Sequence, residues 1–136
     1  MEVRRDVLKL AGLPIAALLA QNAVPIASGV RDAEQARLGN TPVGPARTYF
    51  LGPTEKLKTL RAGSWRIAPG KSPHNIHQHP DEELLIVTEG TGTATVDGKE
   101  SKIGPGSMLY CAANVPHGVF NTGESPMFFY FIRWIV

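Results

Sequence analysis

The sequence predicts an all-β domain, a small sandwich or closed barrel, preceded by an N-terminal signal helix and a linker. Two observations predict the β class. After residue 45, short apolar or alternating runs follow one another with turn residues between them. No stretch of twelve or more residues after residue 30 has a helical period, and the 136-residue chain has room for one domain.

The first 29 residues have the layout of a signal peptide. A charged segment that contains Arg4 and Arg5 precedes an uncharged run over residues 10–20, and small residues suit cleavage near Gly29. The paired arginines resemble the twin-arginine export signal. An amphipathic helix that caps the fold is one alternative. An uncleaved anchor is the other, because residues 10–30 approach the roughly 20 residues that span a bilayer. We expect cleavage, a periplasmic or secreted mature protein, and no stable membrane anchor.

Residues 30–45 lack an apolar period and end in Gly and Pro, so we expect a linker or an arm there. The β domain would then occupy residues 46–136. Asp97-Gly98 stands between two alternating runs and is a strong signal for a two-residue hairpin. The expected strands are, in order, 48–51, 57–60, 64–68, 83–88, 91–96, 99–103, 107–112, 118–121 and 127–136.

The last expected strand, MFFYFIRWIV, is apolar on both faces. One face can line the interior of a barrel, and the other must be covered by a second sheet or a second subunit. We therefore expect a homodimer that forms through a sheet face.

The charge distribution argues against a nucleic-acid-binding protein, and the cysteine content excludes a protein with an intramolecular disulfide. Removal of residues 1–29 changes the formal charge from +2 to +1, because three basic and two acidic residues leave. The remaining Lys and Arg are scattered without a basic stripe, so nucleic acid is not an expected partner. Cys111 is the only cysteine, which excludes an intramolecular disulfide.

Residues 74–83, HNIHQHPDEE, hold three of the four histidines. On a strand, His77 and His79 point to the same side, and Pro80-Asp81 favours a turn that returns Glu83 beside them. Two imidazoles and a carboxylate with open coordination positions suit one divalent transition metal, Fe, Mn, Ni, Cu or Zn, better than Ca or Mg. His117, outside this stretch, offers a further nitrogen ligand.

The first motif of a known family is similar to this stretch. In the cupins, which are small jelly-roll barrels, a Gly precedes His-x-His, a Glu follows, and a second Gly closes the motif. Here Gly70, His77, His79, Glu83 and Gly90 resemble that pattern, with a first spacer of six residues where five is usual.

The second cupin motif resembles the segment 106–121. Gly106, His117 and Asn121 fit its spacing, whereas Ala112 and Asn114 stand where Pro and Gly are usual. The resemblance covers residues 46–136.

The resemblance implies a jelly-roll (cupin) β-barrel with one metal bound inside it. His77, His79, Glu83 and His117 would be the metal ligands. A hydrated polar loop is the alternative for the histidine stretch.

As a first hypothesis, the resemblance implies a metal-dependent oxidoreductase of dioxygenase type that acts on a small organic molecule. The same family includes isomerases and decarboxylases, so the fold alone does not choose the reaction. A module that binds a sugar or an organic acid without turnover is the alternative, and a purely structural metal is a third hypothesis. No catalytic residue can be assigned from the sequence.

Four further side chains are expected outside the ligand set. We expect His74 to be exposed rather than a ligand, and Glu82 to point away from Glu83. Cys111 is expected to be a buried small apolar residue. Arg133 interrupts an apolar strand and needs a partner, and a salt bridge at the rim is favoured over an anion-binding role.

Overall fold

The computed structural model describes residues 23–136, and the described part of the chain contains strands and loops without a helix. Residues 1–22 of the expected signal segment 1–29 lie outside the described residues, and residues 23–29 contain no helix. Within the described range, no helix is long and apolar enough to cross a membrane. The strands are β1 (Arg37–Thr41), β2 (Gly44–Gly52), β3 (Thr59–Ile67), β4 (Glu82–Glu89), β5 (Gly92–Val96), β6 (Lys99–Ile103), β7 (Met108–Cys111), β8 (His117–Phe120) and β9 (Met127–Ile135).

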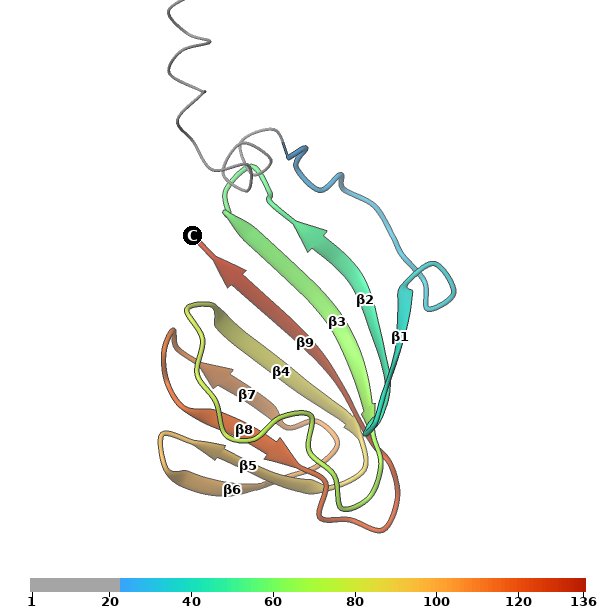
Figure 1. Ribbon diagram of the computed structural model, residues 1–136, viewed down its shortest axis with the longest axis vertical. Coiled ribbons are helices and arrows are strands. Elements are labelled where there is room, and N and C mark those ends of the chain that lie inside the picture. The colour runs from blue at the N-terminus through green and yellow to red at the C-terminus, as the bar shows by residue number, and fades with distance from the viewer. Residues whose placement is uncertain (1–22) are drawn as a thin grey trace, which may run out of the picture.

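The strands form two sheets that enclose one core (Figure 1). The larger sheet has the order β1-β2-β3-β9-β4-β7, and the smaller sheet has the order β6-β5-β8. Buried apolar side chains from both sheets meet between them. They are Ile67, Leu85, Val87, Ala94, Leu109, Cys111, Val119, Met127, Phe129 and Phe131. The all-β prediction is confirmed for the described residues.

Strand β9 lies between β3 and β4 and explains the apolar terminal run. Phe129 and Phe131 are buried in the core, whereas Tyr130 on the opposite face is 41% exposed. Successive side chains of β9 therefore alternate between an inward face and an outward face, and the outward face carries aromatic side chains as the sequence predicted.

Two sequence-based boundaries were wrong. The segment 30–45, expected to be a linker or an arm, contains β1 and the first residues of β2, and β1 pairs with β2 along its whole length. The runs 57–60 and 64–68, expected to be separate strands, both overlap the single strand β3, Thr59–Ile67. Gly63 interrupts the apolar pattern of β3 because a Cβ there would collide with the Arg47 carbonyl oxygen and would approach the Phe131 ring within 2.6 Å.

The turn predictions agree with the backbone. Asp97 and Gly98 both have positive φ, 49° and 79°, and they connect β5 to β6 as the expected hairpin. The departure from the second cupin motif also has a simple explanation. Asn114 stands where Gly is usual and has a φ of 61°, a left-handed conformation that Asn tolerates better than most residues.

Candidate metal centre

The four predicted ligands come from three segments of the chain. His77 and His79 lie on the loop between β3 and β4, Glu83 is the second residue of β4, and His117 begins β8. The sequence predicted that the two histidines lie on a strand that a turn joins to Glu83. The strand was wrong, because His77 forms only an isolated β-bridge and His79 lies outside any strand.

The loop is attached instead to the smaller sheet. The backbone of His77 donates to the His117 carbonyl at 3.0 Å and accepts from the His117 N–H at 2.8 Å, which forms an isolated β-bridge. Asn114 donates its backbone N–H to the His79 carbonyl at 2.8 Å. These bonds hold His77 opposite β8 and His79 opposite the turn that precedes β8, which explains why imidazoles from distant segments converge.

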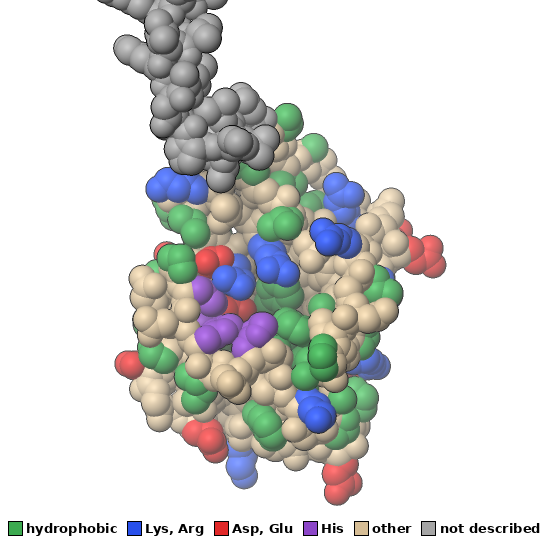
Figure 2. Space-filling view, viewed as in Figure 1, with side chains coloured by type: hydrophobic (Ala, Val, Ile, Leu, Met, Phe, Trp, Pro, Cys, Tyr) green, Lys and Arg blue, Asp and Glu red, His purple; other side chains and the backbone are tan. Residues whose placement is uncertain are grey.

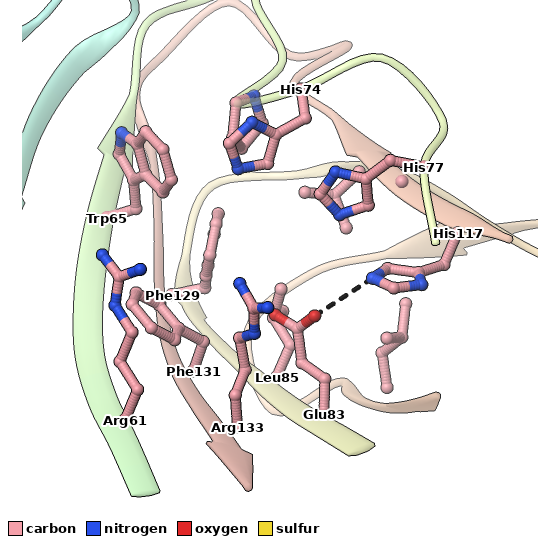
Figure 3. A pocket seen from close by; sticks show the side chains of 14 residues that line it. Arg61, Trp65, His74, His77, Glu83, Leu85, His117, Phe129, Phe131 and Arg133 are labelled. Atoms are coloured by element: carbon pink, nitrogen blue, oxygen red, sulfur yellow. Dashed lines mark hydrogen bonds and ion pairs between the residues drawn. The ribbon is translucent and has the colours of Figure 1, made fainter. Parts of the chain in front are cut away.

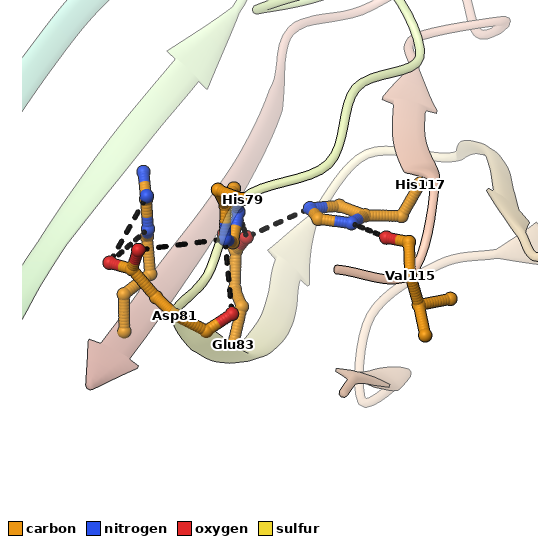
Figure 4. A network of polar contacts seen from close by, with 6 residues as sticks. His79, Asp81, Glu83, Val115 and His117 are labelled. Carbon is orange, nitrogen blue, oxygen red and sulfur yellow. Dashed lines mark hydrogen bonds and ion pairs between the residues drawn. The ribbon is translucent and has the colours of Figure 1, made fainter. Parts of the chain in front are cut away.

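The side chains converge on one point between the sheets. One ring nitrogen from each of His77, His79 and His117 lies within 4.8 Å of the others. Glu83 Oε2 lies 3.0 Å from His79 Nε2 and 3.0 Å from His117 Nε2 (Figure 4). The three histidines are a candidate metal site, and Glu83 as the fourth ligand stays a prediction.

The outer ring nitrogens determine which nitrogen can bind a metal. His79 Nδ1 lies 3.1 Å from the Asp81 carbonyl oxygen, and His117 Nδ1 lies 2.8 Å from that of Val115. A carbonyl only accepts, so each Nδ1 carries the proton, and in a neutral ring Nε2 then holds a lone pair. Both lone pairs face the Glu83 carboxylate, an arrangement that needs a proton or a cation between the atoms.

The charges within the cluster influence one another. Burial opposes ionisation of Glu83, but hydrogen bonds from His117 and His79 outweigh it and hold the Glu83 pKa below its usual range. The hydrogen bond to Glu83 raises the pKa of His117, although burial acts in the opposite direction. Burial lowers the pKa of His77, and the neighbouring histidines add to this effect. A neutral His77 beside an ionised Glu83 suits a cation.

A cavity of about 180 Å³ adjoins the cluster. Figure 3 shows His77, His117 and Glu83 on one side of it, and Trp65 and Arg61 on the opposite side. On the molecular surface, histidine side chains are visible next to basic and acidic ones, so the site communicates with solvent on that face (Figure 2). The remaining cavity wall is mostly apolar and includes Leu85, Leu109, Val119, Phe129 and Phe131.

The sequence did not single out the far wall of the cavity. Trp65 on β3 pairs with Phe129 on β9, and Arg61 on β3 pairs with Arg133 on β9. The two pairs are separated by an even number of residues along each strand, so all four side chains lie on the same inward face. The alternation of each strand was visible in the sequence. The pairing that brings these side chains together joins segments about 70 residues apart, which a single sequence does not reveal.

The side chains expected outside the ligand set behave as predicted, with one addition. Glu82 points outward and accepts a hydrogen bond from Tyr110 at 2.9 Å. Arg133 forms a salt bridge with Asp81 at 3.1 Å. His74 is exposed, as expected, but it also lines the cavity and stacks on His77 with ring centroids 4.7 Å apart.

Residues 63–133, more than half of the chain, match the family model described as Cupin domain. The chain belongs to the cupin family. Solved structures agree on the jelly-roll fold. An RmlC-like cupin from Shewanella frigidimarina has a TM-score of 0.66 at 17% identity, with 81% of this chain and 93% of that chain covered.

Two further relatives extend the comparison. A predicted oxalate decarboxylase from Thermotoga maritima has a TM-score of 0.65 at 19% identity and covers 79% of this cupin and 100% of its own chain. An uncharacterized protein from Methanocaldococcus jannaschii is 31% identical over 62 residues, 45% of this chain. That match spans only 50% of the archaeal protein. At these identities the solved structures show the fold alone.

Proposed function

We propose that this cupin binds one divalent transition metal ion through His77, His79, His117 and Glu83. The observation that carries the proposal is the pair of Nε2 atoms, on His79 and His117, directed at one carboxylate oxygen while their Nδ1 atoms donate to backbone carbonyls. Nitrogen and carboxylate donors in this number suit Fe, Mn, Ni, Cu or Zn.

The proposed activity is that of an oxidoreductase of dioxygenase type acting on a small organic molecule. When bound, the ion would supply open coordination positions and Lewis acidity at the end of the cavity. Glu83 would be both a ligand and a proton acceptor, since it is the only carboxylate of the described cavity wall. Leu85 and Leu109 would restrict water near it.

A binding module without turnover is the second candidate. Apart from Glu83 and the histidines, the described cavity wall carries no group that readily exchanges protons near neutral pH. A site with few such groups can hold an organic molecule at a metal without converting it. Turnover and binding therefore have to be measured separately.

The metal proposal is tested by elemental analysis of the purified protein. We expect about one equivalent of a transition metal per chain in the wild type and little in His77→Ala and His79→Ala, because each loses a nitrogen donor. Glu82→Ala is the matched control, since Glu82 neighbours Glu83 but faces outward to Tyr110. Full metal occupancy in His79→Ala would refute the assignment.

The activity is tested by oxygen uptake of the metal-loaded protein with catechols, flavonols and keto acids. Oxygen consumption that disappears in His79→Ala supports the oxidoreductase. Saturable binding of a compound from this panel without oxygen consumption or product supports the binding module instead. Metal content is measured in the same samples, so that loss of metal and loss of chemistry are distinguished.

Export to the periplasm or the medium belongs to the same proposal. The charged and apolar segments of residues 1–29 support it, and a twin-arginine route would carry the barrel already folded and metal-loaded. The double variant Arg4→Lys, Arg5→Lys should accumulate inside the cell. Normal export of this variant would remove the twin-arginine route from the proposal.

We also propose that the protein is a homodimer. Phe128, Tyr130, Ile132 and Trp134 alternate with the inward residues of β9 and therefore share its outward face. Sedimentation velocity should give a dimer for the wild type and a monomer for Tyr130→Lys. Phe120→Lys is the control, because Phe120 is similarly exposed, 43%, but lies on β8 in the smaller sheet. A monomeric wild type would contradict the dimer.

A further inference from the structure

Two arginines lie directly opposite each other on the inward face of the larger sheet. Arg61 of β3 pairs with Arg133 of β9, which in turn pairs with Glu83 of β4. Like charges at directly opposed positions of neighbouring strands are destabilising. Three charged residues thus form one row across the sheet, and the predicted metal ligand Glu83 stands at one end of it.

Only one of the two arginines is neutralised by the protein. Arg133 donates from Nε and from Nη2 to Asp81 Oδ2 at 3.2 and 3.1 Å. Arg61 forms no ion pair or side-chain hydrogen bond with any described residue, and its guanidinium carbon lies 5.7 Å from the centre of the Phe131 ring. The ring face holds this guanidinium at the cavity wall, where its five donors remain available.

The cavity between Arg61 and the histidines is large enough for a small ligand body. Its volume of about 180 Å³ is slightly larger than the roughly 150 Å³ of an apolar protein cavity that binds one benzene molecule. Trp65, Phe129 and Phe131 form an aromatic wall. The cavity therefore suits a compact apolar body of about one ring with a charged group attached.

We infer that the cavity binds a small monocarboxylic acid whose carboxylate pairs with Arg61 and whose apolar body lies among Trp65, Phe129 and Phe131. The planar guanidinium matches a carboxylate in a two-point hydrogen bond. The part of the ligand away from the carboxylate then lies toward the histidine cluster. This inference rests on the proposed function and names the ligand class of the same site.

The charge balance favours one negative charge on the ligand. Arg133 and Asp81 neutralise each other, and Glu83 is balanced by its histidine neighbours or by a bound metal. Arg61 is the remaining cation of the cavity wall. A neutral molecule could not form an ion pair with this solvent-exposed guanidinium.

The test is a fluorescence titration of the metal-loaded full chain with benzoate. Trp65 lines the cavity, and Trp134→Phe serves as the background because Trp134 is the only other tryptophan and lies on the outward face. We expect benzoate to change the Trp65 emission with saturation and benzamide, its neutral analogue, to bind at least tenfold more weakly. Arg61→Gln should weaken benzoate at least tenfold, and Arg61→Lys should recover part of the loss.

Arg66→Gln is the matched control for charge. Arg66 lies on the same strand but on the outward face, where it pairs with Glu89, so its loss should leave benzoate affinity within about twofold. Equal benzoate affinity in Arg61→Gln and wild type would overturn the inference, as would equal binding of benzamide or of inorganic phosphate. Metal content is measured in parallel. If the metal-loaded protein does not bind benzoate, this inference alone is contradicted. If the purified wild type contains no metal, the proposed function is contradicted.

Discussion

The Cys111 thiol stands next to Glu83 on the neighbouring strand and is fully buried. Burial, with a smaller contribution from the Glu83 charge, raises the Cys111 pKa from 9.0 to about 11. This lowers the thiolate fraction at pH 8 by roughly 100-fold, and the thiolate is the reactive form. The residue is a packing element of the core, which confirms the expectation from the sequence.

We predict that iodoacetamide modifies native Cys111 at least 100-fold more slowly at pH 8 than the same protein unfolded in urea. Mass spectrometry of timed samples measures both rates. The double variant Cys111→Ala, Ala112→Cys is the control, because Ala112 is exposed and a thiol there should react at nearly the unfolded rate. Equal rates for native and unfolded wild type would show that the core opens at Cys111.

At the residue scale, the sequence predicted which side chains meet at the site but not how they are oriented. His-x-His followed by Glu83, with His117 further along, has the donor types and the spacing of a metal site. The ring orientation depends on hydrogen bonds from Nδ1 to the carbonyls of Asp81 and Val115. Because every residue has a backbone carbonyl, the sequence does not indicate which carbonyl accepts the hydrogen bond from each Nδ1.

At the element scale, the strands with clear alternation could be predicted and the exposed edge strand could not. β1, RLGNT, has exposed residues at four of its five positions, so it carries no apolar period. Backbone pairing with β2 makes it a strand. The histidine loop shows the same limit, because its backbone bonds to β8 fix its course.

The turn after β4 packs closely against the residues at the start of β9, and this contact can be tested. Gly90 has a φ of 77°, and a Cβ there would lie 2.5 Å from the Pro126 carbonyl oxygen and 2.7 Å from Met127 Cα. A left-handed backbone costs a non-glycine residue roughly 1–2 kcal/mol, and overpacking typically adds about 1–3 kcal/mol. We predict that Gly90→Ala lowers the free energy of unfolding by about 2–5 kcal/mol, measured by urea denaturation.

Gly98→Ala separates the two causes. Gly98 has nearly the same φ, 79°, but a Cβ at that position would meet no atom within 4 Å. This variant should lose only the conformational part, about 1–2 kcal/mol. Equal losses in the two variants would show that the close approach of Gly90 to residues 126 and 127 contributes nothing to stability.

At the scale of the whole molecule, the candidate site connects the two sheets. Glu83 belongs to the larger sheet, His117 belongs to the smaller sheet, and the loop histidines reach the site from between β3 and β4. A metal held by all of them would link three segments far apart in the sequence. Metal binding to the folded state alone then contributes directly to folding free energy.

The last prediction follows from this link between the sheets. A ligand present at 100 times its dissociation constant stabilises the folded state by about 2.7 kcal/mol. For a chain of this size, each kcal/mol changes the melting temperature by about 4 °C, so chelation of the metal should lower it by about 10 °C. Differential scanning calorimetry with and without EDTA measures the change. His79→Ala, which should hold little metal, should melt at the same temperature in both conditions, whereas Glu82→Ala should respond like the wild type. A wild type that contains metal but melts identically after its removal would show that the ion does not hold the two sheets together.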